Sequence, residues 1–121
     1  MLRIGNITFD CEQPARVAEF WAAALSYQVK EGGNEFFAEV SHPDGTLPNL
    51  LFIKVPEPRA VKNRVHVDLG ADDREAEIAR LIGLGATRGE THEMYGITWT
   101  VLQDPEGNEL CVGQQDEQIQ I

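Results

Sequence analysis

The most informative stretch of the chain is Val65-His66-Val67-Asp68-Leu69, which alternates hydrophobic and polar side chains in the period of a β-strand. Its three aliphatic residues are expected to face a packed layer, and its histidine and aspartate then share the opposite face. A histidine and a carboxylate cannot lie in a dry core without polar partners. This face is therefore expected to look either into bulk water or into a cavity.

Two other segments show the same alternation. The first covers about residues 2–11, with Ile7, Phe9 and Cys11 on its apolar side, and its polar side carries Asn6, Thr8 and Asp10. The second covers residues 108–113 and places Glu109 and Cys111 on one face. Three such strands predict a sheet that packs helices on one face and curves around a pocket on the other. A sheet with one wet face explains the pattern equally well.

Helical spacing of hydrophobic residues occurs twice. Residues 14–25 begin with a proline, which suits a first helical turn because its missing amide hydrogen has no partner there. Residues 73–84 form the second stripe. Asp72 is predicted to cap this helix, with Glu75 reaching back as in a capping box, and Gly85 suits its left-handed end.

The order of strand, helix and three strands is repeated with a period near 60 residues. The remaining strands are predicted at residues 27–31, 36–41, 50–55, 86–89 and 97–102. A proline-containing connector covers residues 56–63, and residues 90–96 are predicted to form a loop. One module alone exposes a sheet face that it cannot cover. We therefore predict one α+β domain over residues 1–121, built from modules 1–58 and 63–121 that form a cupped mixed β-sheet with helices outside.

Composition and charge exclude several classes of partner. Ten basic and twenty acidic residues give a formal net charge of −10, which repels phosphate backbones and anionic membranes, so we expect neither nucleic acid nor membrane as a partner. Two cysteines, no signal-like N-terminus and no apolar run of about 18 residues predict a cytoplasmic protein with free thiols. If the strand phases hold, Cys11 and Cys111 lie on opposite faces of the sheet and do not pair.

The chain resembles the vicinal oxygen chelate superfamily, and more closely its glyoxalase-like and bleomycin resistance protein-like members. The resemblance rests on the duplicated βαβββ order, on Gln-Pro at 13–14 followed by Phe-Trp at 20–21, and on Asp-Pro-Glu-Gly-Asn at 104–108. It implies the glyoxalase/bleomycin resistance/dioxygenase fold and a homodimer. It also implies either a metal-dependent enzyme, such as a lyase, isomerase, dioxygenase or thiol transferase, or a metal-free protein that binds small molecules.

The metal site of the superfamily carries over poorly. The positions of its four ligands correspond, in order, to Asn6, to a residue near Phe52, to His66 and to Cys111. Only His66 is of the usual kind, and residues 50–55 contain no plausible ligand. Because a divalent site normally takes at least three protein ligands, no metal or other cofactor is expected. The alternative is a divalent metal in a non-standard site made of His66, Glu109 and Cys111, with Asp10 or Asp68.

The polar strand faces can support chemistry without a metal. His66 is predicted to act as a general base or acid. Since alternate residues of a strand lie about 7 Å apart at their Cα atoms, Asp68 should act on it without a direct hydrogen bond. We assign catalytic roles to His66, Asp68 and Glu109. Ligand contacts are assigned to Asn6, Asp10, Phe52, Trp99 and Cys111, with the two aromatic rings as flat walls.

Three hypotheses follow. The leading one is a glyoxalase-like protein with a small-molecule pocket, acting as a binder or a metal-independent enzyme. The second is a metal-dependent lyase, isomerase or dioxygenase with an altered ligand set, and the third is a dimeric interaction module without chemistry. A hydrogen-bonded structural role for His66 and a core position for Trp99 also stay open.

Overall fold

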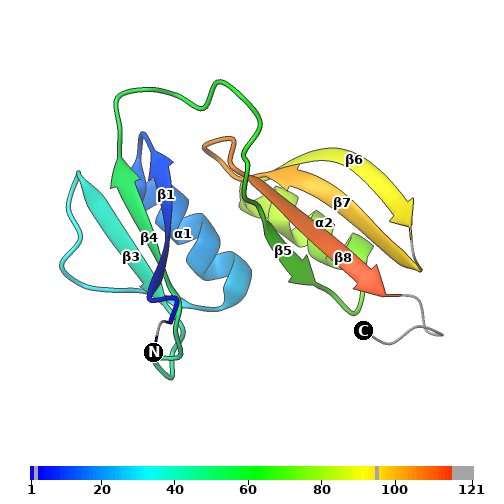
Figure 1. Cartoon of the computed structure of the whole chain (residues 1–121), viewed down its shortest axis with the longest axis horizontal. Coiled ribbons are helices and arrows are strands. Elements are labelled where there is room, and N and C mark those ends of the chain that lie inside the picture. The colour runs from blue at the N-terminus through cyan, green and yellow to red at the C-terminus, as the bar shows by residue number, and fades with distance from the viewer. Residues whose placement is uncertain (2, 95, 116–121) are drawn as a thin grey trace. The chain divides into compact units, whose positions relative to one another are not determined.

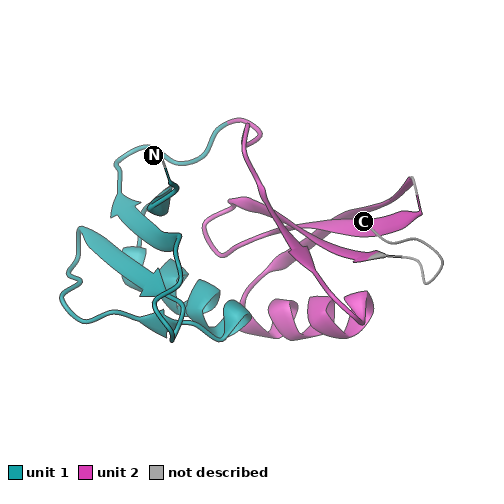
Figure 2. Cartoon of the chain, turned by 60° about the horizontal axis from the view of Figure 1, so that its bottom comes forward, with its two compact units in different colours: residues 1–60 teal, residues 61–121 magenta. Residues whose placement is uncertain are grey.

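The computed structural model describes residues 1–121 except 2, 95 and 116–121. The chain divides into two compact units, residues 1–60 (unit 1) and 61–121 (unit 2), shown in two colours in Figure 2. This division falls inside the connector predicted at residues 56–63. Each unit has its own helix and its own sheet.

Unit 1 is a four-stranded sheet with one helix (Figure 1). It contains β1 (Asn6–Cys11), α1 (Pro14–Leu25), β2 (Gln28–Val29), β3 (Phe37–Ser41) and β4 (Asn49–Lys54). The strand order is β1-β4-β3-β2. β1 pairs parallel with β4, and the other two pairs are antiparallel. The helix predicted at residues 14–25 is confirmed.

Unit 2 repeats this arrangement. It contains β5 (Val67–Gly70), α2 (Arg74–Leu84), β6 (Thr87–Met94), β7 (Ile97–Gln103) and β8 (Glu109–Gln115). The strand order is β5-β8-β7-β6, and β5 pairs parallel with β8. The prediction of two tandem βαβββ modules is thus confirmed. Within the described part of the chain, no helix has the length and hydrophobicity needed to span a membrane.

The core of unit 1 lies between α1 and one face of its sheet. The Phe9 ring lies 5.1 Å from the rings of both Trp21 and Phe52, measured between centroids. Trp21 and Phe52 are fully buried. Full burial of such a side chain stabilises the fold by roughly 1.5–3 kcal/mol. The other face of β1 carries Asn6, Thr8 and Asp10, all exposed, so the predicted alternation in this strand is confirmed.

The core of unit 2 packs α2 against the hydrophobic side chains of β7 and β8. The fully buried residues are Ile78, Leu81, Leu102, Leu110 and Val112. Thr100 is also fully buried, and its hydroxyl accepts a hydrogen bond from Arg74 Nη1 at 2.7 Å. The Thr91 hydroxyl is a second partner at 2.8 Å, so this buried hydroxyl avoids the cost of an unmade hydrogen bond. The bond from Arg74 ties the first residue of α2 to the sheet.

The cap of α2 differs from the prediction. Asp73, not Asp72, is the N-cap, and its side chain accepts a hydrogen bond from the Ala76 amide at 3.1 Å. A capping box needs its glutamate three residues after the cap, so Glu75 is one position too early. Its carboxylate instead accepts two hydrogen bonds from the Arg88 guanidinium, at 2.8 and 2.9 Å. The predicted end at Gly85 is confirmed, with φ at +121°.

The loop predicted at residues 90–96 was wrong for most of its length, because β6 continues to Met94. Every side chain of β6 is exposed, so no hydrophobic alternation marks the strand in the sequence. It is held by antiparallel pairing with β7, with a register shift between Arg88 and Thr91. Backbone hydrogen bonds therefore define this strand, and burial does not.

Two expectations about strand faces also change. Val65 precedes β5 and is 79% exposed, so it does not face a packed layer. The nearly continuous hydrophobic run at residues 50–55 predicts a strand covered on both faces, but in β4 only Leu50 and Phe52 are buried, while Leu51 and Ile53 are half-buried.

The Asp-Pro-Glu-Gly-Asn motif forms a buried turn between β7 and β8. Asp104 Oδ1 accepts hydrogen bonds from the amides of Glu106 and Asn108, at 2.8 and 3.0 Å. The Asp104 amide donates to the Asn108 carbonyl at 2.8 Å, and Gly107 takes a φ of +87°. The motif is therefore structural, and it sets the start of β8 at Glu109.

We predict that the Glu75–Arg88 pair supports unit 2 in a pH-dependent way. Hydrogen bonding from Arg88 lowers the pKa of Glu75 to about 2, from an ordinary value of 4.5. A depressed folded pKa contributes stability above pH 4.5 that is lost as the pH falls toward 2. In urea unfolding experiments, Glu75→Gln should be less stable than wild type at neutral pH, and this difference should shrink between pH 4.5 and 2. An equal difference at all pH values would contradict this, and Glu93→Gln on β6 serves as the control.

Candidate functional site

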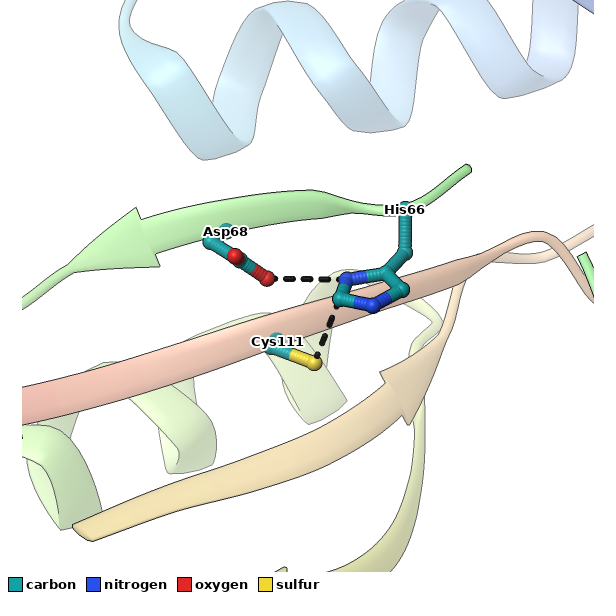
Figure 3. Close-up of side chains that lie close together, drawn as sticks. All are labelled: His66, Asp68 and Cys111. Atoms are coloured by element: carbon teal, nitrogen blue, oxygen red, sulfur yellow. Dashed lines mark hydrogen bonds and ion pairs between the residues drawn. The ribbon is translucent and has the colours of Figure 1, made fainter. Parts of the chain in front are cut away.

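Three side chains with ligating or acid–base chemistry meet where β5 begins (Figure 3). His66 directly precedes β5, and the parallel pairing of β5 with β8 sets Asp68 opposite Cys111. His66 Nδ1 lies 2.9 Å from Asp68 Oδ1 and 3.8 Å from Cys111 Sγ. Of the residues predicted from the sequence, the structure brings these three together, and we call them the His66 cluster.

The contact between His66 and Asp68 is direct, which corrects the expectation that Asp68 acts without a hydrogen bond. His66 lies just outside the regular strand, so its side chain does not follow the spacing of strand residues. An ionised carboxylate can only accept, so His66 Nδ1 donates its hydrogen to Asp68. This tautomer leaves Nε2 free of hydrogen and able to accept a proton. The His66 side chain is 40% exposed, so a solute can reach it.

Cys111 is a buried thiol that stays neutral near pH 7. Burial raises its pKa to about 11, and the negative charges of Asp68 and Glu109 act in the same direction, while Lys62 opposes them. In a nucleophile–histidine–carboxylate triad, the nucleophile and the carboxylate contact different imidazole nitrogens. Here both contacts go to His66 Nδ1. Cys111 therefore packs beside His66 and is not set up as an activated nucleophile.

Glu109, predicted as a catalytic residue, makes a reciprocal pair of hydrogen bonds with Asn63. The backbone amide of Asn63 donates to Glu109 Oε1 at 3.1 Å, and the backbone amide of Glu109 donates to Asn63 Oδ1 at 2.8 Å. We call this pair the Asn63–Glu109 clasp. It joins the end of the connector to the first residue of β8. Sequence patterns did not indicate Asn63, because it lies in a segment without periodicity.

Trp99 lies on β7, on the same face of the sheet as Cys111. It is half-buried, and its ring centroid lies 5.4 Å from that of His92. Across the sheet, Trp99 faces Gly113 and Gly113 faces Gly70. A Cβ added at Gly70 would meet nothing within 4 Å, and one at Gly113 would come no closer than 3.7 Å to Trp99. The sheet face between Trp99 and the His66 cluster is therefore bare of side chains at two neighbouring positions.

The other predicted ligand contacts, Asn6, Asp10 and Phe52, belong to unit 1. Asn6 and Asp10 are exposed on β1. Phe52 is fully buried in the core with Phe9, on the opposite face of the sheet. Phe52 therefore does not lie on the face that carries Asn6 and Asp10. The register of β1 with β4 shows that Leu51 and Ile53 are the β4 side chains on that face.

We predict that Cys111 reacts slowly with alkylating agents. Because the thiolate is the reactive form, the rate of carboxamidomethylation by iodoacetamide should keep rising above the ordinary thiol value of 9.0, toward pH 11. Asp68→Asn removes a negative charge and should move the midpoint of this rate–pH curve to lower pH. Asp10→Asn in unit 1 should leave it unchanged. Peptide mapping by mass spectrometry separates Cys111 from Cys11, and a Cys111 midpoint at or below 9 would contradict the assignment of a neutral thiol.

Comparisons with known proteins agree with this fold. The family model described as "Glyoxalase-like domain" matches residues 6–113. A glyoxalase/bleomycin resistance protein/dioxygenase family enzyme from Burkholderia phytofirmans PsJN superposes with a TM-score of 0.76 at 17% identity, covering 94% of this chain and 99% of that one. No significant match was found among curated proteins.

Two other solved structures are similar to the chain. A possible glyoxalase from Bacillus cereus has a TM-score of 0.70 at 17% identity, covering 93% of this chain and 98% of that one. A lactoylglutathione lyase from Agrobacterium tumefaciens has a TM-score of 0.66 at 16% identity, covering 94% of both chains. At these identities the likeness establishes the fold, and the chemistry has to be argued from the residues of this chain.

Proposed function

This chain belongs to the glyoxalase-like domain family, and from that premise we propose that it binds a small molecule on the open face of the unit 2 sheet and exchanges a proton with it through His66. One observation carries the proposal. Asp68 accepts a hydrogen bond from His66 Nδ1 at 2.9 Å, which orients the ring and leaves Nε2 as a proton acceptor. No step of this chemistry requires a bound metal.

The position of the ligand is proposed from the bare part of the sheet face. Gly70 and Gly113 leave room beside Cys111 and Asp68, and Trp99 borders this room on the next strand. A planar or compact ligand resting on the two glycines would contact the flat ring of Trp99. It would also lie next to the His66 cluster, where proton transfer needs hydrogen-bond distance.

The four-ligand metal site of the superfamily does not fit this chain. One ligand position holds Asn6, whose amide is a weak neutral donor, and another falls near Phe52, whose ring is buried in the core of unit 1. A divalent site normally takes at least three protein ligands. The proposed proton transfer therefore involves no metal at those positions.

A second candidate function is supported by the spacing of the His66 cluster itself. The ligand atoms of His66, Asp68 and Cys111 all lie within 4.8 Å of one another. Imidazole, carboxylate and thiolate are the donors that zinc prefers. A metal here would displace the proton of the Cys111 thiol, and it would compete with the hydrogen bond between His66 and Asp68. The second candidate is thus a metal-dependent lyase, isomerase or dioxygenase with a non-standard ligand set.

The binding proposal predicts that ligands stabilise the protein without metal. A panel of small carbonyl, phenol and amine compounds is screened by thermal shift in the presence of a chelator. For any compound that raises Tm, His66→Ala should weaken binding about tenfold, the cost of about 1.4 kcal/mol for one hydrogen-bonding group. Gly70→Leu should abolish binding while leaving the fold intact, because the added side chain fills the bare position.

Two control variants accompany this experiment. His42→Ala removes a partly exposed histidine of unit 1, and Gly83→Leu fills open space beside a glycine on α2. Neither variant should weaken the binding of those compounds whose affinity falls in His66→Ala. Failure of the whole panel, with and without metal, would favour the non-catalytic interaction module. A large loss of stability in His66→Ala would mark His66 as a structural residue.

The metal content of the purified protein decides between the two candidates. We predict no stoichiometric zinc, nickel, iron or manganese, since the usual ligand positions are lost at Asn6 and near Phe52, and in the His66 cluster the hydrogen bond of His66 Nδ1 with Asp68 competes with a metal. Elemental analysis is the measurement. About one transition metal per chain, lost in both His66→Ala and Cys111→Ser, would overturn this prediction and favour the metal-dependent enzyme.

A further inference from the structure

We infer that Asn63 and Glu109 are positioning residues, whose clasp holds His66 in the orientation that its contact with Asp68 requires. The inference rests on the proposed function for the role of His66, but the clasp itself is a separate feature. Its two hydrogen bonds join residues 46 positions apart, and each bond uses one backbone amide and one side-chain oxygen. This reciprocity fixes both backbones at the point where they meet.

The segment between the clasp and β5 has little else to hold it. Arg64 and Val65 are exposed, and Val65 is 79% exposed, so burial does not anchor this segment. Its two ends are fixed differently: the pairing of Val67 with Leu110 begins regular β5, and Asn63 is held by Glu109. His66 lies between these anchors. Its backbone position is therefore set by the length of a short chain fixed at both ends.

The register of the two strands explains why the clasp acts on His66. One step back from the pairing of Val67 with Leu110, a regular strand would set His66 directly opposite Glu109. Glu109 instead binds Asn63, so residues 64–66 follow an irregular path and β5 begins only at Val67. This irregular path frees the His66 side chain from strand spacing, and its Nδ1 reaches Asp68 at 2.9 Å. The clasp and the His66–Asp68 bond are thus parts of one arrangement.

This role differs from a catalytic role for Glu109. Its Oε1 already accepts a hydrogen bond from the Asn63 amide, and that bond needs an acceptor oxygen but no negative charge. A glutamine at position 109 keeps such an oxygen. A catalytic carboxylate, by contrast, depends on its charge and would not be replaced by an amide. The two roles therefore predict opposite results for the same substitution.

The test measures the tautomer of His66 by long-range ¹H–¹⁵N NMR on the full, ligand-free chain. In the wild type, the Nδ1–H form should dominate. In Asn63→Ala and Glu109→Ala, the Nδ1–H signal should lose intensity to the Nε2–H form, because the freed segment lets His66 leave Asp68. Glu109→Gln should keep the wild-type spectrum. Asn34→Ala is the matched control, since Asn34 also accepts backbone hydrogen bonds, from Phe36 and Phe37 in unit 1.

The outcomes separate the clasp from the proposed function. An unchanged His66 tautomer in both alanine variants, or a Glu109→Gln spectrum like that of Glu109→Ala, overturns the inference. If one alanine variant unfolds, the His66 tautomer is compared between the other alanine variant and Glu109→Gln, which preserves the hydrogen bond. For a compound that binds the wild type, the alanine variants should bind more weakly by up to about tenfold, the loss expected for His66→Ala, because the clasp acts through His66. A tautomer change in the alanine variants, together with failure of every compound to bind the wild type, would support the clasp and count against the proposed function.

Discussion

The parallel pairing of the first and last strand of each unit is the constraint on which the rest of the structure depends. β1 pairs with β4 and β5 with β8, and a parallel pair can be joined only through a long crossover connection. The helix in each crossover packs on one face of its sheet, so the fully buried core side chains lie on that face. In unit 2, the same pairing sets Asp68 opposite Cys111 on the other face, which also carries Trp99.

The side chains of the proposed acid–base site lie where the regular pairing of β5 with β8 begins. His66 is the last residue before β5, and that position lets its ring approach both Asp68 and Cys111. A proton on Nδ1 and a metal ion would compete for the same atom. In the structure this nitrogen lies 2.9 Å from Asp68 Oδ1. The proposed acid–base role and the alternative metal role therefore depend on what one ring nitrogen holds.

The surroundings of the cluster combine rigid and open elements. The turn at residues 104–108, with Asp104 and Asn108 buried, sets the start of β8, and the Asn63–Glu109 clasp fastens that start to the connector. On the other side, Gly70 and Gly113 leave the sheet face bare next to Trp99. These fixed and open elements are what support the proposed position of a ligand beside the His66 cluster.

The sequence by itself determined the duplicated βαβββ order, α1 at residues 14–25, and the alternation that marks β1, because these depend on local periodicity. It could not determine β6, whose side chains are all exposed and which exists through pairing with β7. Nor could it place Phe52, because a strand's burial depends on which face its neighbour covers.

The His66 cluster divides in the same way between sequence and structure. The alternation at residues 65–69 marked His66 and Asp68 as neighbours on a polar face, and the C-terminal strand marked Cys111. Their direct contact, the neutral state of the thiol and the partnership of Glu109 with Asn63 were decided by the tertiary structure. Periodicity specifies which way a side chain points, but distances across strands depend on register and on where a regular strand begins.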